Sequence, residues 1–227
     1  MRKINFVTGE LYHIMNRGVD KRIIFDNKED VERFFLCLNE LNTSNVTFGI
    51  KEIKRNNKFQ HSVLEKIKDD DDKLVDFIGY NVLPNHFHFI LRQRSEAGIS
   101  KFLHKIQMAY TKYYNAKNTR SGGLFQGAFR AEHVDSNEYL LHLSAYVNLN
   151  HLLHVKFQHS VLETSSSIGQ YIGDSNGIIK CDTGIILDQF ESKNGYEKFM
   201  MDTLEDIRKR KVMLKELEND DINLINS

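Results

Sequence analysis

Two histidines, His86 and His88, stand one residue apart in the segment PNHFHFIL. In an extended strand, alternate side chains point to the same face, so we expect both imidazoles on one face with Phe87 and Phe89 in the core. Two neutral imidazoles on one strand face can bind one divalent metal ion. A solvated strand face that carries two histidines and no metal explains the same pattern. Large barrel hydrolases also use such a pair, but they need roughly 250 residues and repeated strand–helix units.

A tyrosine with polar neighbours lies on a predicted helix further along the chain. His142, Tyr146 and Asn150 are spaced four residues apart, so they form one polar stripe on a helix otherwise rich in leucine and valine. A phenol, with an ordinary pKa of ~10, can act as a covalent nucleophile when a metal ion polarises the electrophile. Asn150 can supply an oxygen ligand to the same ion. The alternative interpretation is a tyrosine at the rim of an amphipathic helix, without a chemical role.

Positive charge and aromatic rings are concentrated between the histidine pair and the tyrosine. Residues 92–130 contain eight Lys or Arg side chains and one acid, Glu96, with Tyr and Phe residues interleaved. Such a surface suits phosphates, with rings that can stack on unpaired bases. A solvated helix face beside core aromatics is the competing explanation. Because the whole chain has 31 basic and 31 acidic residues, the local excess favours an anionic partner.

Alternating and continuous apolar runs predict the strands that position these residues. One strand is expected over 11–25, interrupted at Asn16-Arg17-Gly18 and resumed over 22–25. Two more are expected over 74–92, separated by a turn at Leu83-Pro84-Asn85. Residues 44–73 contain mixed charges and an aspartate run, which indicates an inserted segment.

Helices are predicted where apolar residues recur with helical spacing. Two of them begin at pairs with capping-box spacing, Asp26 with Glu29 and Asp135 with Glu138. The four predicted helices cover residues 26–38, 99–115, 135–153 and 196–218.

The composition limits the class of protein. A chain of 227 residues that is 41% hydrophobic and 27% charged suits one domain with or without a tail, and it is not typical of a disordered chain. No apolar run approaches 18 residues and none of signal-peptide length is present at the start, so we expect neither a membrane span nor export. Cys37 and Cys181 cannot form a disulfide framework or a four-cysteine zinc site. The octapeptide KFQHSVLE occurs at 58–65 and 156–163, too few copies for a solenoid.

Taken together, these motifs resemble the single-tyrosine, His-hydrophobic-His transposases, in particular the REP-associated tyrosine transposases. YHIMNRGVDKRIIF is similar to the opening strand of that family with its Asn-Arg-Gly turn, and VLPNHFHFIL to its metal-binding strand. RSGGLFQGAFRAEHV resembles the loop and strand before the catalytic helix, and YLLHLSAYVNLN resembles that helix. SSSIGQYIG and ILDQF are similar to its carboxy-terminal stretch. By position, the resemblance makes His86 and His88 the metal-binding pair, Tyr146 the nucleophile and Asn150 the residue that completes the metal site.

The resemblance also implies a fold. We expect the α+β class, with a ferredoxin-like antiparallel sheet that has helices on one face, followed by a helical carboxy-terminal extension. The transposase domain is expected over 1–155, with an insertion near 44–73, and the extension over 156–227.

The implied activity is that of a metal-dependent single-stranded DNA endonuclease and strand transferase. It uses Mg²⁺ or Mn²⁺ but no nucleotide cofactor, and it cuts beside a DNA hairpin through a 5′-phosphotyrosine intermediate. Because family members act as homodimers, we expect a homodimer, located in the prokaryotic cytoplasm with the nucleoid. The candidate phosphate contacts are Arg17, Lys101, Lys105, Arg120 and Arg130.

The chain departs from the family pattern at two positions. A proline usually follows the asparagine, where this chain has His151, and an arginine often precedes the loop-strand phenylalanine, where Ala128 precedes Phe129. Neither change replaces the tyrosine or the histidines, so we expect the chemistry to be retained and DNA contacts to differ. Two other functions fit the same residues. One is a DNA-hairpin-binding protein that does not cut, and the other is a metal-dependent hydrolase that activates water while Tyr146 is structural.

Overall fold

A computed structural model describes residues 4–44, 72–153, 165–173 and 177–225 of the protein. Residues 45–71 of the expected insertion and both copies of KFQHSVLE lie outside these ranges. Within the described ranges, no helix combines the length and apolar character that crossing a membrane requires.

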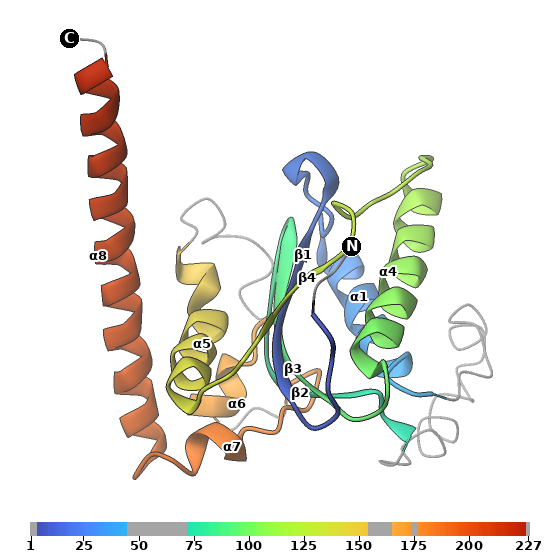
Figure 1. The fold of residues 1–227 in the computed structure, drawn as a ribbon. Coiled ribbons are helices and arrows are strands. Elements are labelled where there is room, and N and C mark those ends of the chain that lie inside the picture. Colours follow the sequence, from blue (N-terminus) through green and yellow to red (C-terminus); the bar gives the residue numbers. More distant parts are fainter. Residues whose placement is uncertain (1–3, 45–71, 154–164, 174–176, 226–227) are drawn as a thin grey trace.

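A four-stranded antiparallel sheet forms the centre of the molecule (Figure 1). Its strands are β1 (Leu11–Arg17), β2 (Val75–Leu83), β3 (His86–Gln93) and β4 (Arg130–His133), in the spatial order β2-β3-β1-β4. Helix α1 (Lys28–Glu40) connects β1 to β2, and α4 (Gly98–Lys117) connects β3 to β4. This chain order is that of the ferredoxin-like βαββαβ motif, so the expected α+β fold is confirmed.

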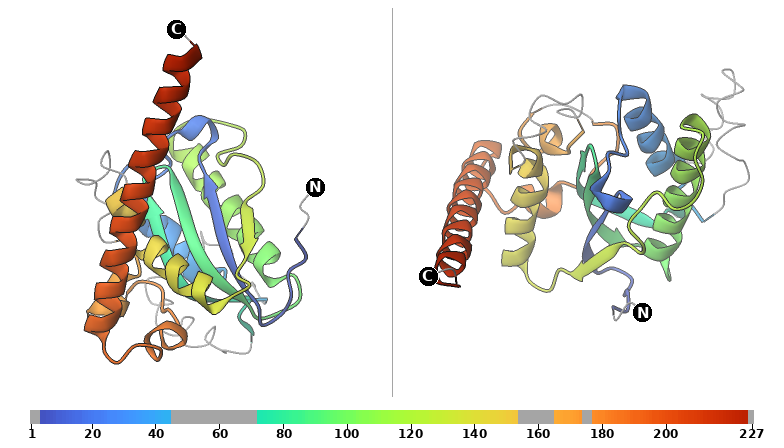
Figure 2. Two further views of the ribbon diagram at one scale, coloured as in Figure 1. Left: turned by 60° about the vertical axis from the view of Figure 1, so that its left-hand side comes forward. Right: turned by 90° about the horizontal axis from the view of Figure 1, so that it is seen from above.

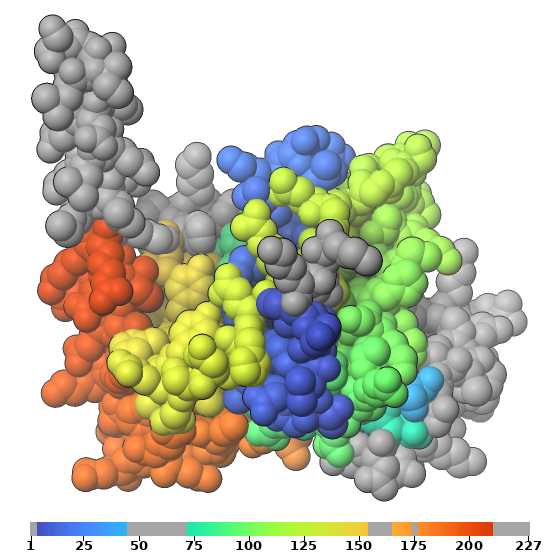
Figure 3. All heavy atoms as spheres, in the orientation of Figure 1, coloured from blue at the N-terminus to red at the C-terminus, as the bar shows by residue number. Residues whose placement is uncertain are grey.

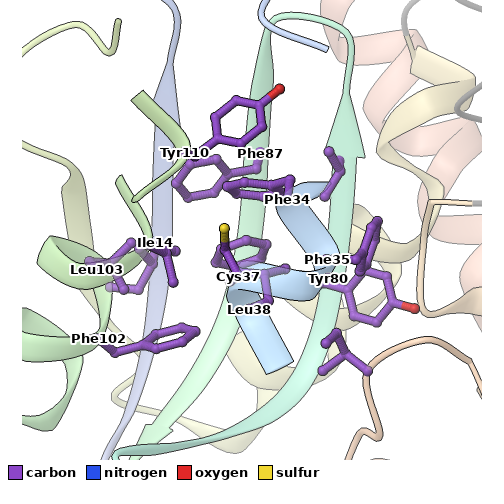
Figure 4. Packing of buried hydrophobic residues seen from close by; sticks show 14 of the residues in the cluster. Ile14, Phe34, Phe35, Cys37, Leu38, Tyr80, Phe87, Phe102, Leu103 and Tyr110 are labelled. Carbon is purple, nitrogen blue, oxygen red and sulfur yellow. The ribbon is translucent and has the colours of Figure 1, made fainter. Parts of the chain in front are cut away.

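Helices α1 and α4 cover one face of the sheet, as expected, and the main core lies between them and the strands (Figures 1 and 4). Because strand side chains alternate, Phe87 and Phe89 of β3 point to this face, where their rings pack near Phe34 of α1. Phe102 and Tyr110 of α4 close the same cluster.

The opposite face of the sheet is covered as well, by α5 (Asn137–Leu149), with α8 (Lys193–Ile225) packed outside α5 (Figures 1 and 2). The predicted layer of helices on one face of the sheet therefore consists of α1 and α4. The structure adds a second helical layer on the opposite face. Ile78 and Ile90 present apolar surface to that side, and they form a second core cluster with residues of α5 and α8.

The segments after η3 (Asn150–Leu153) return to the sheet. They include the short helices α6 (Ile168–Ile172) and α7 (Gly184–Leu187). The Val82 N–H donates to the Ser165 carbonyl at 3.1 Å, and the Asp182 N–H donates to the Phe77 carbonyl at 2.8 Å. These bonds pair some of the backbone N–H and carbonyl groups along the open edge of β2. Unpaired, those groups would be available for pairing with another chain. The predicted division of the chain near residue 155 stays a prediction.

Three local predictions needed correction. The strand expected over 22–25 does not form, because the N–H groups of Ile24 and Phe25 both donate to the Pro84 carbonyl, at 2.8 and 3.0 Å. The first and third predicted helices begin one residue later than their capping-box pairs indicated. Asn27 accepts from the Asp30 N–H at 3.1 Å, and Ser136 accepts from the Tyr139 N–H at 3.2 Å.

Candidate active site

The strand register places His86 and His88 on the face of the sheet that α5 covers. Their neighbours Phe87 and Phe89 point to the other face, as the alternation predicted. Directly opposite His88 lie Met15 on β1 and Asn81 on β2. The predicted histidine pair thus lies in the middle of the sheet, with a strand on each side.

Helix α5 brings Tyr146 to His88. The two rings meet edge-on with centroids 5.5 Å apart, and the Tyr146 ring lies 6.2 Å from that of His13. Burial raises the pKa of Tyr146, the polar contact with the Asn150 amide lowers it, and the Glu132 charge raises it further. The phenol is therefore protonated at neutral pH, so it needs help from its surroundings to act as a nucleophile.

A buried polar network fixes the position of α5 over the strands. The Asn81 side-chain amide, directly opposite His88, donates to the Val147 carbonyl at 2.9 Å. On the outer side of the helix, the hydroxyl of Tyr196 from α8 contacts Ser144 at 2.9 Å and accepts from Asn148 at 3.2 Å. Tyr146 is consequently held on a helix that is hydrogen-bonded both to the sheet and to α8.

Asn150 follows Tyr146 by one helical turn and is fully buried. Neither its side-chain oxygen nor its nitrogen makes a hydrogen bond of full geometry within the described part of the chain. Its polar contact is with the Tyr146 phenol, and a buried amide oxygen without a full hydrogen bond is also suited to be a ligand to a cation. Two imidazoles and an amide oxygen are suitable ligands for a divalent ion, so His86, His88 and Asn150 fit the expected metal. The described residues contain no cluster of three or more His, Cys, Asp or Glu side chains that could hold an ion by themselves.

His13 is a site residue that the sequence analysis missed. Its Nε2 atom lies 3.0 Å from Nδ1 of His88, and its Nδ1 atom lies 3.6 Å from a carboxylate oxygen of Glu132. Burial lowers the pKa of His13, although the Glu132 charge opposes this effect. His13 shares a face with Arg17 in the strand 11–17, so strand alternation in YHIMNRG was the signal that could have identified it.

A cavity of about 370 Å³ opens beside the histidine pair. Its lining includes His86 and His88 together with three cationic side chains, Arg17, Lys21 and Arg130. The Arg17 side chain donates to the Gln126 side-chain oxygen. Two of the five predicted phosphate contacts, Arg17 and Arg130, are therefore brought to the histidines.

The other three predicted phosphate contacts lie elsewhere. Arg120 donates to the Asn115 side chain at 2.7 Å and to the Gly123 carbonyl at 3.0 Å, so it holds the loop after α4. Lys101 and Lys105 lie on α4, which covers the face of the sheet away from the histidines. Lys105 donates to the Thr43 carbonyl at 2.7 Å, and burial, with Lys101 nearby, lowers its pKa.

A second cavity, of about 580 Å³, is lined by Tyr146 and His13, together with other residues of α5, α8 and the strands β1 and β4. Figure 3 shows the segment that contains β4 and α5, in yellow, between the described residues of α8 and the amino-terminal segment, in blue. His142 lines this cavity and its ring packs 5.3 Å from that of Phe199 on α8. Of the polar stripe predicted for this helix, His142 and Tyr146 both line the second cavity, whereas Asn150 is fully buried.

Comparison with known proteins assigns the family. The model of the IS200-like transposases matches residues 7–150, more than half of the chain. The chain belongs to the IS200-like transposase family. The resemblance to the single-tyrosine transposases is thereby confirmed, and the protein is a DNA-binding enzyme of transposition at this level of description. The matched range contains all the predicted site residues of this transposase.

Solved structures similar to this transposase include the following one. It is a REP-associated tyrosine transposase bound to a REP hairpin, with 11% sequence identity and a TM-score of 0.46 over 76% of this chain and 84% of that chain. No curated protein matches the chain.

Proposed function

We propose that this transposase is a metal-dependent endonuclease and strand transferase for single-stranded DNA, with Tyr146 as its nucleophile. The observation that carries the proposal is the edge-on contact between the rings of Tyr146 and His88, at 5.5 Å. Tyr146 packs at the edge of the second core cluster, as a rim tyrosine would, and it also lies directly against His88 of the histidine pair. Contact with His88 is the position that a metal-assisted nucleophile requires.

The reaction is a transesterification. The phenolic oxygen of Tyr146 forms a bond to the phosphorus of a DNA phosphodiester, and the phenol loses its proton. The bond from phosphorus to the 3′ oxygen breaks, and that oxygen takes up a proton to become a free 3′-hydroxyl. The 5′ side of the strand stays on the enzyme as a 5′-phosphotyrosine. Attack by another 3′-hydroxyl reverses these steps and joins the strands, so the reaction needs no nucleotide cofactor.

His86, His88 and Asn150 are the residues that would hold the metal, Mg²⁺ or Mn²⁺. When bound, the ion supplies Lewis-acid polarisation of the scissile phosphate. Arg17 and Arg130, in the adjacent cavity, orient the phosphate. The packing of α5 on the sheet keeps the Tyr146 ring against that of His88.

The DNA partner is proposed to be a hairpin with a flanking single strand. The single strand enters the cavity that contains Arg17 and Arg130, where its phosphates meet cationic side chains. Lys101, Lys105 and Arg120 lie away from this cavity, so we assign them to DNA further along the substrate. A homodimer, and a location with the nucleoid in a prokaryotic cytoplasm, complete the proposal.

Denaturing electrophoresis of a labelled hairpin library incubated with the protein and Mn²⁺ tests the proposal. A slow-migrating, protease-sensitive band is expected, and sequencing the DNA in that band identifies the target. Cut DNA without an adduct would instead favour a hydrolase that uses water. Retention of the hairpin on native gels, with no cutting, would favour the binding protein.

A further inference from the structure

The protonation of His86 is fixed by its neighbour Asn85. Nδ1 of His86 lies 2.6 Å from Oδ1 of Asn85. The orientation of that amide is set in turn, because its nitrogen donates to the Lys21 carbonyl at 3.0 Å, which can only accept. Oδ1 therefore faces His86 as an acceptor, and Nδ1 of His86 must carry a proton to donate to it. In the neutral imidazole this leaves the lone pair on Nε2.

The protonation of His88 follows from its contact with His13. Nδ1 of His88 and Nε2 of His13 lie 3.0 Å apart, so one of them donates to the other. If His13 donated from Nε2, its own Nδ1 would turn a lone pair toward the Glu132 carboxylate, 3.6 Å away, and the two would repel. If His88 donates from Nδ1, the proton of His13 is on Nδ1 and faces the carboxylate. Glu132 therefore favours the second arrangement.

We propose that His13, oriented by Glu132, and Asn85 are positioning residues that set the tautomer of the histidine pair. Both His86 and His88 carry their proton on Nδ1 and present the Nε2 lone pair. The use of those lone pairs for a metal rests on the proposed function, whereas the tautomers are a property of the metal-free chain.

The arrangement has a physical purpose, because a histidine can bind a metal only through an unprotonated nitrogen. A partner on the second nitrogen fixes both the tautomer and the orientation of the ring, and losing such a partner typically lowers metal affinity 10- to 100-fold. His13 and His88 are both buried, at 3% and 6% exposure, so water does not replace their mutual bond easily. The pair is therefore organised for a cation before one arrives.

Nuclear magnetic resonance of the metal-free protein tests the tautomers directly. Long-range ¹H–¹⁵N correlation of the imidazole nitrogens, at about pH 8 where exposed imidazoles are neutral, distinguishes Nδ1–H from Nε2–H. Loss of signals in His86→Gln and His88→Gln assigns the two rings. Nδ1–H is expected for both, and Nε2–H on either ring would overturn the assignment for that ring.

Three variants test the part played by His13. His13→Ala is expected to weaken Mn²⁺ binding, followed by electron paramagnetic resonance, by 10- to 100-fold. His13→Gln places an amide oxygen near the former Nε2 and should restore most of the affinity. Glu132→Gln, at a side chain 57% exposed and so safe for folding, should give His88 a mixture of both tautomers.

His133→Ala is the matched control. His133 also pairs with a glutamate, Glu10 at 2.9 Å, but it lies beside Tyr12 on the other side of β4. It should change neither Mn²⁺ affinity nor the His88 tautomer. Unchanged Mn²⁺ affinity and tautomer in His13→Ala would overturn the role of His13. If the wild-type protein shows both Nδ1–H tautomers but binds no Mn²⁺, the tautomer inference stands and the metal in the proposed function fails.

Discussion

The rings of Tyr146 and His88 stand at 90° to each other, with the edge of one against the face of the other. This contact joins the helix that follows the sheet to the strand at its centre. A second tyrosine of α5, Tyr139, lies two turns earlier and donates instead to the Glu132 carboxylate at 3.1 Å. The two tyrosines therefore share a helix face but differ in what they contact, which allows the nucleophile to be identified by substitution.

Tyr146→Phe removes one hydroxyl and keeps the ring, so stability should change by no more than about 1 kcal/mol. Binding to hairpin DNA should be retained, while the covalent adduct should disappear because the ester oxygen is gone. Tyr139→Phe is the matched control and should still give the adduct. Both are measured by denaturing electrophoresis with labelled single-stranded DNA and Mn²⁺. A protease-sensitive shifted band from Tyr146→Phe would show that another residue is the nucleophile.

Metal removal should separate cutting from binding. The donor set of His86, His88 and Asn150 makes a modest site, so cleavage should require added Mg²⁺ or Mn²⁺ and stop in EDTA. Hairpin binding should continue in EDTA, because phosphate contacts do not depend on the ion. His86→Ala should abolish cutting with little loss of stability, since His86 is only half-buried. Undiminished cleavage in chelator would remove the metal from the mechanism.

Much of this site was predictable because it depends on local spacing. The turn at Pro84-Asn85 and the alternation through Phe87 and Phe89 placed the histidine pair correctly on one face of β3. The helical spacing of leucines placed Tyr146 on a helix. These patterns are encoded within a few residues of the groups they position.

The features of the site and fold that the sequence did not predict depend on pairings between segments that are distant in the chain. His13 and Asn81 became site residues only because β1 and β2 both flank β3 in a definite register, which no local pattern specifies. The apolar run Ile23-Ile24-Phe25 has strand character, yet it is held by the carbonyl of Pro84 in another turn. Tertiary hydrogen bonds override local propensity there.

Salt dependence should locate the phosphate contacts. For a short single strand, each contact contributes roughly −0.7 to the log–log slope of affinity against salt. Arg17→Gln with Arg130→Gln, in the cavity beside the histidines, should flatten that slope by about one to two units. Lys101→Gln with Lys105→Gln should leave the short strand unaffected and flatten the slope only for the longer hairpin. Fluorescence anisotropy at several salt concentrations measures the slope for each double variant with the short strand and with the hairpin.

The reverse pattern would relocate the DNA path. If the α4 pair alone flattens the slope for the short strand, the single strand runs over α4. Because Lys105 also donates to the Thr43 carbonyl, thermal unfolding of the lysine variants should accompany the binding data.

Asn81 should matter for catalysis more than for DNA binding. Asn81→Leu keeps a similar side-chain volume but removes the side-chain donor at 2.9 Å from the Val147 carbonyl, which retains the backbone N–H of Asn150, at a cost of about 1 kcal/mol. Because this bond holds α5 over the strand beside His88, formation of the adduct should slow while affinity for the short single strand is retained. Asn118→Leu is the control, since Asn118 also donates to a helix carbonyl, that of Tyr114 at 2.9 Å, but on α4. Equal adduct rates for both variants would contradict the positioning role.

Tyr196 should make α5 and α8 sensitive to alkaline pH. Burial raises the pKa of Tyr196 to about 12, although its bonds with Ser144 and Asn148 lower it. In the unfolded chain the phenol titrates near its ordinary pKa of ~10. Below that pH both states are protonated and the contribution of Tyr196 is complete. Above it the unfolded chain loses its proton first, so the free energy of unfolding falls by up to about 1.4 kcal/mol per pH unit until the folded phenol titrates.

Tyr196→Phe should therefore have opposite effects at the two ends of the pH range. Near neutral pH it removes the partner of the buried Asn148 side-chain nitrogen and one of the two partners of the Ser144 hydroxyl, and it should cost about 1–3 kcal/mol. Above pH ~10 its stability should decline less steeply than that of the wild type, because one titrating phenol has been removed. Urea unfolding at several values between neutral pH and about pH 11 gives both curves. Parallel curves over the alkaline range would mean that Tyr196 does not hold its proton more tightly in the folded state.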